Sequence, residues 1–256
     1  SSSIKYQLVD PDSGESLASG IVERIGDATG SITHKRAGER TDITEPVPDH
    51  GFGLSEVLRL FDEQGPSLAQ AHVVAVGHRV VQGGHYFSGP ALIDDDVVAK
   101  IEELVPLGPL HNPAHLKGIE VGRQLLADVP HVAVFDTAFF QRLPEEAARY
   151  GLNRKVADTY SIRRYGAHGT SHQFVSGEIA ERLERDDLKQ IVLHLGNGAS
   201  VSAVVAGRAV ETSMGLTPLE GLVMGGRTGD IDPAAVFHLV RVAGMSIDEI
   251  DHLFNW

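Results

Sequence analysis

One arrangement of short strands followed by a helix occurs twice in this sequence, and it limits the possible folds more than any other feature. Runs that alternate apolar and polar residues fill residues 4–47 and again residues 190–214. Turn-forming residues separate the runs, and each set precedes apolar side chains at helical spacing. This weak internal duplication predicts an α/β protein with two domains of like fold that face each other across a cleft.

Two short apolar runs lie between the repeats, "HVVAVG" at residues 72–77 and "HVAVFDTAF" at residues 131–139. Such runs are typical of buried strands in a sheet that is covered on both faces. The first run leads into Arg79, and the second is expected to place Asp136 at the end of its strand. Because open α/β sheets bind ligands at the carboxyl ends of their strands, we expect both side chains near a ligand site.

Helical spacing and capping residues predict the remaining elements. A helix that begins after His168 is expected to bury Phe174, Val175 and Ile179. We place the domain boundary between residues 148 and 149. Two further helices are expected over residues 54–61, with an end at Gly65-Pro66, and over residues 97–105. Three others are expected to begin at Asn112 as N-cap, at Asp232-Pro233, and at Ser246 with Glu249 as capping-box partner.

Composition excludes several classes of function. With 22 Lys and Arg against 35 Asp and Glu, the net charge of −13 argues against nucleic acid or an anionic membrane surface as partner. The chain has no cysteine, which excludes disulfides, thiolate nucleophiles and cysteine metal sites and suits a cytoplasmic protein. No apolar run approaches the roughly 18 residues that span a bilayer. An anionic ligand would therefore need a local cluster of cations.

Two histidine pairs have the i, i+4 spacing of a zinc site: His168 with His172, and His111 with His115. Gly169 and Thr170 lie within the first pair, where a helix is only starting, and neither first histidine is followed by glutamate. We therefore favour a structural or phosphate-contacting role over a zinc site.

Glycine-rich segments supply candidate anion contacts. Residues 194–202, "HLGNGASVS", follow a predicted strand and offer backbone N–H groups, although a simple hairpin turn fits the segment equally well. Arg79 and Arg227 lie among glycines and could present planar forks to a carboxylate or phosphate. For Arg163 and Arg164 we expect solvated surface charge.

Acidic residues follow apolar or glycine-rich segments at Asp136, Asp230 and Asp232. They could hold Mg²⁺ directly or through water, or orient a nucleophile, although Pro233 favours a helix cap for Asp232. No covalent nucleophile with a positioned base is evident. Anion-binding loops, arginines, a histidine and an aspartate together predict phosphoryl transfer between bound anions, which depends on positioning and charge neutralisation.

Eight segments in order resemble the acetate kinase family along essentially the whole chain. They are "SSSIK", "VGHRVVQGG", "PLHNP", "VFDTAF", "RRYGAHGTSH", "HLGNGAS", "TSMGLTPLEGL" and "RTGDIDP". The resemblance implies the duplicated actin-like, ribonuclease H-like fold of sugar kinases, actin and heat-shock ATPases. It implies reversible transfer from ATP to acetate, giving acetyl phosphate and ADP with Mg²⁺ or Mn²⁺. It further implies a cytoplasmic homodimer, with an acyl-side domain at 1–148 and an incomplete nucleotide-binding domain at 149–256.

The resemblance also assigns roles to matching positions. Arg79 would grip the substrate carboxylate, Asp136 would orient Arg79 and a Mg²⁺-bound water, and His168 and Arg227 would stabilise the phosphoryl group in transit. The residues that would wall the pocket for the acetate methyl are Val81, Leu110, Ala167 and Pro218. The residues that would line the nucleotide phosphates are Ser1, Ser3, Lys5, His194, Leu195, Gly196, Asn197 and Gly198. No metal ligand is assigned within the chain.

The sequence departs from the family in two ways. Ala167 stands where the family usually has phenylalanine, so we expect a wider pocket that accepts propionate more readily. Family motifs that precede the serines and follow residue 256 are missing, so we expect an incomplete chain that by itself binds ATP poorly. Three alternatives remain open: a propionate kinase, a non-catalytic actin-like nucleotide switch, and a histidine-rich metal-binding protein.

Overall fold

The computed structural model describes residues 3–109 and 111–255, which form two compact units. The chain passes between the units repeatedly. The first unit comprises Ser1–His78, Leu92–Glu102 and Pro109–Ala133, and the second comprises Arg79–Ala91, Glu103–Gly108 and Val134–Trp256. This division by contacts differs from a single boundary between residues 148 and 149. That boundary and the cleft between duplicated domains stay predictions.

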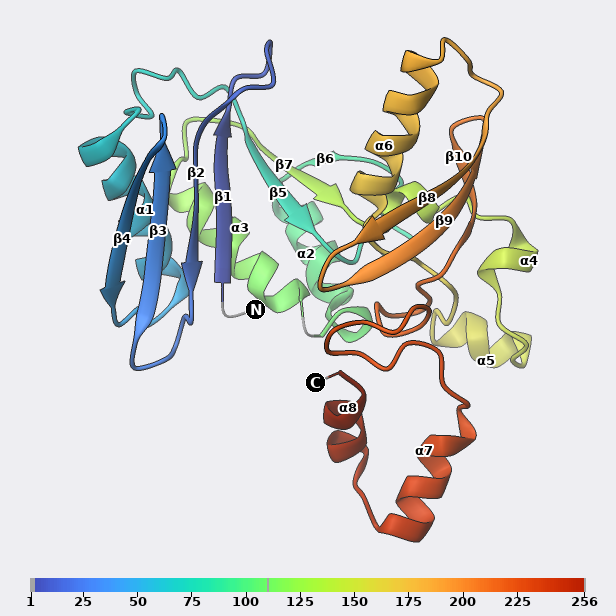
Figure 1. The fold of residues 1–256 in the computed structure, drawn as a ribbon. Helices are drawn as coiled ribbons and strands as arrows, with labels where there is room; N and C mark the ends of the chain where they lie inside the picture. Colours follow the sequence, from blue (N-terminus) through green and yellow to red (C-terminus); the bar gives the residue numbers. More distant parts are fainter. Residues whose placement is uncertain (1–2, 110, 256) are drawn as a thin grey trace. The chain divides into compact units, whose positions relative to one another are not determined.

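The first unit contains the N-terminal meander that the alternating pattern predicts. Its antiparallel sheet has the order β1 (Ser3–Val9), β2 (Ser16–Glu23), β3 (Gly30–Arg36), β4 (Glu39–Glu45). Helix α1 (His50–Gln64) packs on this sheet, and α3 (Asn112–Leu125) packs beside α1 (Figure 1). The apolar side chains between them form a core of Ala18, Val22, Ile32, Val47, Val57, Leu60 and Phe61. The expected helix end at Gly65 is confirmed, because Gly65 follows α1 at a φ of 74°.

A second sheet has the strand order β5 (Val76–Val80), β7 (His131–Phe135), β6 (Ala91–Leu92). The strand predicted at residues 72–77 is wrong in position, because β5 begins only at Val76. Val76 makes the first contact, donating its N–H to the Pro130 carbonyl, whereas His72 has a left-handed φ of 49° that interrupts an extended path. Arg79 therefore lies within β5 and not beyond its end.

Short helices connect these strands. They are α2 (Asp95–Glu103) and the single-turn η1 (Val105–Leu107), which match the helical pattern over 97–105. The N-cap expected at Asn112 is displaced by one residue. His111 has the non-helical backbone angles of a cap, and Asn112 is the buried first residue of α3.

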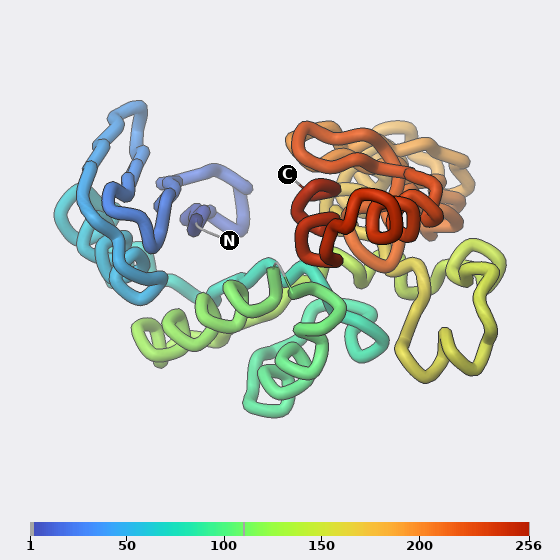
Figure 2. The backbone as a smooth tube through the Cα atoms, turned by 90° about the horizontal axis from the view of Figure 1, so that it is seen from below, coloured from blue at the N-terminus to red at the C-terminus, as the bar shows by residue number. Residues whose placement is uncertain are grey.

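The second unit contains the second predicted meander, an antiparallel sheet ordered β10 (Arg208–Thr212), β9 (Ala199–Val205), β8 (Lys189–Leu195). Helix α6 (Gly169–Arg182) packs against β8, and three short helices precede it: η2 (Ala138–Phe140), α4 (Glu145–Ala148) and α5 (Arg154–Thr159). The chain then runs through α7 (Ala234–His238), η3 (Leu239–Ala243) and α8 (Ile247–Asn255), two adjacent helical coils in Figure 2.

Capping in this last segment follows the sequence closely. The Ser246 N–H donates to Glu249 Oε2 at 2.8 Å, and the Glu249 N–H donates back to Ser246 Oγ at 3.2 Å, which confirms the capping box. The cap expected at Asp232 is displaced by one residue: Pro233 is the N-cap of α7, and Asp232, just before it, accepts from the Ala234 N–H at 2.9 Å. No described residue of α7 is buried, however, so its apolar side chains are not part of a core here. None of the described helices is long and apolar enough to cross a bilayer.

The buried face predicted for α6 is wrong. Phe174, Val175 and Ile179 are 66%, 40% and 41% exposed, whereas His172 and Ser176 are buried. Gln190 of β8 donates its side-chain N–H to the Ser176 carbonyl at 3.1 Å. The inward face of α6 is thus polar and hydrogen-bonded, and apolar periodicity cannot identify such a face.

A histidine pair in the first unit predicts a pH-dependent stability. His78 Nε2 and His131 Nδ1 are 2.7 Å apart, and His131 Nε2 lies 3.0 Å from the Leu126 carbonyl. Burial, followed by the proximity of His131, lowers the pKa of His78 from 6.5 to about 4. The unfolded chain therefore binds more protons than the folded chain between these values, and stability falls as pH falls.

We expect the free energy of unfolding to decrease as pH is lowered from about 6.5 towards 4. Denaturant titrations at successive pH values would measure it, and His78→Gln should flatten the slope in this window. An unchanged slope in that variant would contradict this assignment.

Candidate active site

The second unit joins an arginine and a buried aspartate from neighbouring strands. Arg79 of β5 donates to both carboxylate oxygens of Asp136, from Nε to Oδ1 at 3.0 Å and from Nη2 to Oδ2 at 2.6 Å. The Asp136 N–H donates to the Val80 carbonyl at 2.9 Å, which aligns the two strand ends. Asp136 is 1% exposed, whereas the Arg79 side chain is 63% exposed. The buried carboxylate thus fixes a guanidinium that remains open to a ligand.

These hydrogen bonds, the largest cause, and the negative charge of Asp136 together raise the pKa of Arg79. Its cationic form is therefore retained throughout the neutral range. Arg79 is held in one orientation by a planar two-point contact, a geometry that suits recognition of a carboxylate or phosphate.

The start of α6 lies directly against the end of β7. The Gly169 N–H donates to the Asp136 carbonyl at 2.9 Å. A Cβ at position 169 would lie 2.1 Å from that oxygen, so only glycine fits this approach. The preceding residue, His168, caps α6 with a φ of 60°. This left-handed conformation is costly for a residue with a Cβ, and such strain concentrates at functional sites.

His168 lies among aromatic and cationic groups. Its ring stacks on His194 with 4.1 Å between centroids, and a Cβ at Gly198 would lie 3.3 Å from His168 Nε2 and 3.6 Å from Arg227 Nη1. Burial, followed by the charges of His194, Arg79, His172 and Arg227, lowers the pKa of His168 to about 3. His168 is therefore neutral at pH 7, beside two arginines.

Arg227 is held by backbone and sulfur contacts. Nη1 donates to the Pro218 carbonyl at 3.1 Å and lies 3.8 Å from the Met224 sulfur. Burial lowers the pKa of Arg227, and no carboxylate in the described part of the chain offsets that effect. A half-buried guanidinium without a carboxylate partner is suited to an anionic ligand.

A polar cluster supports the loop that carries Pro218. Tyr150 and Glu220 are hydrogen-bonded through the phenol oxygen, which also accepts from the Leu216 N–H at 2.8 Å. Arg164 lies 3.0 Å from Glu220 and donates to the Thr212 carbonyl at 3.0 Å. No sequence pattern indicates this cluster, because its members are far apart along the chain.

The expectation of solvated surface charge at Arg163 and Arg164 is wrong. The Arg164 side chain is 23% exposed and bonded as described above. The Arg163 guanidinium lies 5.7 Å from the Tyr165 ring centroid, and Nε donates to the Arg164 carbonyl at 3.3 Å. Both arginines therefore have structural contacts that a local sequence pattern does not reveal.

A second histidine of the same motif is completely buried. His172 Nε2 lies 2.7 Å from Ser200 Oγ, and His172 Nδ1 lies 2.8 Å from Ser202 Oγ. Ser200 Oγ also lies 2.9 Å from His168 Nδ1. Neither serine was predicted as a site residue, although their alternation along "ASVSAVV" places them on one strand face. Both nitrogens of His172 are occupied, so His172 does not act as a metal ligand in this structure.

The glycine-rich turn between β8 and β9 brings further predicted residues together. The Gly196 N–H donates to the Gly198 carbonyl at 3.0 Å, and His194 Nδ1 lies 3.0 Å from Ser171 Oγ. A Cβ at Gly225 would lie 2.6 Å from Asn197 Oδ1, so Asn197 lies close to the loop that leads to Arg227. The Leu195 side chain is 72% exposed.

The other predicted residues are distributed as follows. Val81 and Ala167 are buried, at 8% and 2% exposure. Ser3 and Lys5 lie on β1 of the first unit. Ser1 and Leu110 lie outside the described residues. Their proposed contacts with substrates stay predictions.

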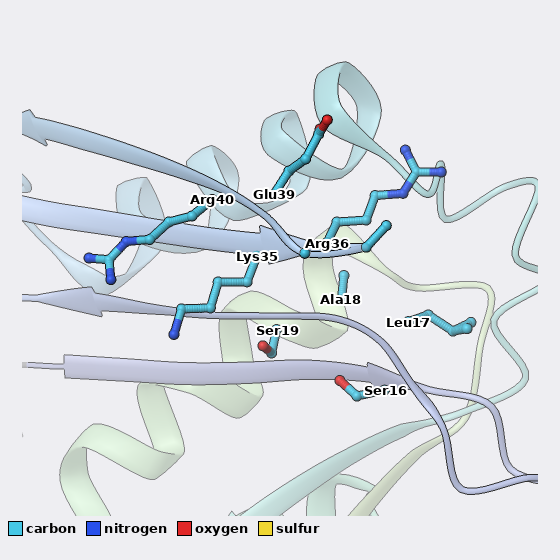
Figure 3. Close-up of a pocket in the computed structure, with 10 residues that line it drawn as sticks. Ser16, Leu17, Ala18, Ser19, Lys35, Arg36, Glu39 and Arg40 are labelled. Carbon is cyan, nitrogen blue, oxygen red and sulfur yellow. The ribbon is translucent and has the colours of Figure 1, made fainter.

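Residues 3–109 and 111–255 contain no group of three or more histidine, aspartate or glutamate side chains that could hold a metal ion. Asp230 Oδ1 accepts from the Gly221 N–H at 2.8 Å, and Asp232 accepts from the Ala234 N–H as described above. A hollow on the first unit, along β2 and the β3–β4 turn, includes Lys35, Arg36 and Arg40 but no predicted site residue (Figure 3).

Comparisons with known proteins show the family to which the chain belongs. The model of the Acetokinase family matches residues 1–256. Curated acetate kinases of Corynebacterium aurimucosum and Streptomyces coelicolor are 55% and 56% identical over the whole chain, which spans 64% of the length of each. A propionate kinase structure from Francisella tularensis has a TM-score of 0.93, and a Porphyromonas gingivalis acetate kinase structure has one of 0.92. Each is 41% identical, and the match covers the whole of this chain and 65% of the solved chain. The expected α/β, actin-like fold class is thereby confirmed.

Proposed function

Because the chain belongs to the acetokinase family, we propose that the protein transfers a phosphoryl group reversibly from ATP to acetate, giving acetyl phosphate and ADP. One observation carries the proposal. Arg79, His168 and Arg227 lie together in the second unit, close enough for both arginines to lower the pKa of His168. A short carboxylate and a phosphoryl group are the anions that such a cluster would hold.

Each residue has a separate task in this mechanism. Asp136 holds Arg79 in a fixed plane, and Arg79 binds the acetate carboxylate whose oxygen attacks the γ-phosphorus. His168 Nε2 and the Arg227 guanidinium, which both adjoin Gly198, donate to the phosphoryl oxygens as they gain negative charge. The bond from phosphorus to the ADP oxygen breaks as the bond to the carboxylate oxygen forms, so no proton transfer is required.

A divalent cation fits this site as a partner of the nucleotide. Mg²⁺ commonly retains water and binds through one or two carboxylates together with substrate phosphates. Both Asp136 oxygens bond to Arg79, but a carboxylate has about four lone-pair sites, so Asp136 can also hold a metal-bound water. When bound, Mg²⁺ or Mn²⁺ would neutralise part of the phosphate charge.

The remaining expectations extend the same proposal. Ser1, Ser3, Lys5 and residues 194–198 would contact the nucleotide phosphates, and the resemblance supports a cytoplasmic homodimer. Lys5 carries an ammonium group, a donor that phosphates commonly bind.

Trapping the product with hydroxylamine tests the reaction. A kinase gives hydroxamate that depends on ATP, acetate and Mg²⁺, whereas a non-catalytic nucleotide switch binds ATP without forming hydroxamate. Absence of hydroxamate from the purified full-length protein with ATP, acetate and Mg²⁺ would reject the proposal.

Replacing Ala167 by phenylalanine is expected to shift specificity towards acetate. An aromatic side chain would narrow the acyl pocket, and one methylene in such a pocket changes discrimination by about 10- to 200-fold. The ratio of kcat/KM for propionate to that for acetate measures the effect. Val81→Ile, a smaller change at another predicted wall position, provides a comparison. An unchanged ratio in Ala167→Phe would show that Ala167 does not face the acyl group.

A further inference from the structure

A line of hydrogen bonds connects the interior of the second unit to the ring of His168. Ser202 Oγ contacts His172 Nδ1 at 2.8 Å, and His172 Nε2 contacts Ser200 Oγ at 2.7 Å. Ser200 Oγ in turn contacts His168 Nδ1 at 2.9 Å. Ser202, His172 and Ser200 are 1%, 0% and 0% exposed, so water does not compete for these groups.

The direction of this line follows from counting protons. A neutral imidazole has one N–H and one lone-pair nitrogen, and each hydroxyl has one proton to donate. Burial, followed by the charge of His194, lowers the pKa of His172 to about 4, so His172 is neutral at pH 7. Three arrangements place one proton in each of the three contacts: all donors point towards His168, all point away from it, or His172 Nε2 and His168 Nδ1 both donate to Ser200. In the third arrangement the buried Ser200 hydroxyl proton has no acceptor, because within the described residues Ser200 Oγ contacts only these two nitrogens.

The buried end decides between the two remaining arrangements. If the donors point away from His168, Ser202 Oγ accepts from His172 and its own hydroxyl proton needs another acceptor. Within the described residues, Ser202 Oγ has no contact besides His172. A buried hydroxyl without an acceptor costs about 1–3 kcal/mol. If the donors point towards His168, every proton in the line has an acceptor.

We infer that Ser202, His172 and Ser200 fix neutral His168 in the tautomer with its proton on Nε2. In this arrangement the Ser200 hydroxyl donates to His168 Nδ1, and the remaining ring proton lies on the nitrogen that adjoins Gly198 and Arg227. The two serines and His172 are positioning residues. The catalytic consequence rests on the proposed function, in which His168 Nε2–H donates to the phosphoryl group, but the tautomer itself does not.

The opposite tautomer would oppose that function. Its lone pair on Nε2 would face the phosphoryl oxygens and repel them. Protonation of His168 would also supply an N–H, but burial and the surrounding His194, Arg79, His172 and Arg227 disfavour the charged ring. A fixed neutral tautomer provides the donor without that additional charge.

Nitrogen-15 NMR of histidine-labelled protein tests the inference directly, because the two ring nitrogens of a neutral tautomer have different chemical shifts. His168→Gln identifies the His168 signals by their loss. We expect the wild-type protein to show His168 protonated on Nε2 at pH 7. A proton on Nδ1 would overturn the inference, whatever reaction the protein catalyses.

Ser200→Ala tests the connection to catalysis. We expect a mixture of both His168 tautomers and a decrease in kcat of about 10- to 100-fold, with KM for acetate changed by less than about twofold. Ser202→Ala should shift the tautomer in the same direction by a smaller amount. If His168 keeps its tautomer in both variants, the inference is wrong.

Ser171→Ala is the matched control. It removes the serine contact of the neighbouring His194 but leaves Nδ1 of His168 bonded to Ser200. The His168 tautomer should be unchanged, and an equal shift in this variant would contradict the assignment. If the tautomer responds as expected but no acyl phosphate forms, the positioning inference stands and the proposed function fails.

Discussion

Replacement of Arg227 by alanine is expected to lower kcat for acyl phosphate formation by about 10²- to 10³-fold, with a much smaller change in KM for acetate. Arg227 has no carboxylate partner in the described part of the chain, and its Nη1 lies near Gly198 together with His168 Nε2. In the proposed reaction its charge acts where the phosphoryl oxygens become more negative. The loss should therefore appear in the chemical step and not in acetate binding.

Two further variants sharpen this prediction. Arg227→Lys keeps the charge but loses the planar fork, so we expect an intermediate kcat. Arg208→Ala removes an exposed arginine from β10 of the same unit and should keep wild-type kcat. Initial rates of hydroxamate formation measure all three proteins. A wild-type kcat in Arg227→Ala would remove Arg227 from the mechanism.

Replacement of Gly169 by alanine is expected to destabilise the protein by about 2–3 kcal/mol and to abolish most activity. The added Cβ would lie 2.1 Å from the Asp136 carbonyl oxygen and 3.0 Å from the Phe139 Cβ. Backbone atoms cannot move aside as a flexible side chain can, so the start of α6 must shift. That shift would displace His168 and would also weaken the hydrogen bonds by which Asp136 orients Arg79.

Gly177 provides a matched control within the same helix. No atom lies within 4 Å of a Cβ added there, so Gly177→Ala should be neutral or stabilise the protein by up to about 1 kcal/mol. Denaturant unfolding of both variants measures the difference, and hydroxamate formation measures activity. Equal stability of the two variants would show that close approach at Gly169 is not important.

Patterns that depend on neighbouring residues were predicted well from the sequence. Both meanders were found from their alternation, because each strand buries one face only and its turns contain glycine or charged residues. The capping box of Ser246 and Glu249 was found because its contacts span three residues. Asp136 was placed correctly at the end of a strand.

Patterns that depend on distant partners were predicted poorly. The face of α6 was assigned from Phe174, Val175 and Ile179, but the inward residues are hydrogen-bonded to β8 and β9. The expectation of surface charge at Arg164 was wrong because its partner, Glu220, lies 56 residues further along the chain (220 − 164). Arg79 was expected beyond the end of a strand because the apolar run begins at residue 72. The first sheet contact is made four residues later, by Val76.

The sequence by itself determined the family, the two meanders and the identities of the charged groups, since local periodicity and ordered motifs are sufficient for these. Tertiary structure alone decided the two-point geometry of the contact between Arg79 and Asp136, the close approach of Gly169 to the Asp136 carbonyl, and the alignment of two serines behind His168. The physical reason is that a hydrogen bond depends on the distance and direction between two atoms. For residues far apart in the sequence, both are set only after the strands that carry them have paired. The hydrogen-bond donors among Ser202, His172 and Ser200 point in one direction because these side chains are buried, and no sequence pattern specifies that burial.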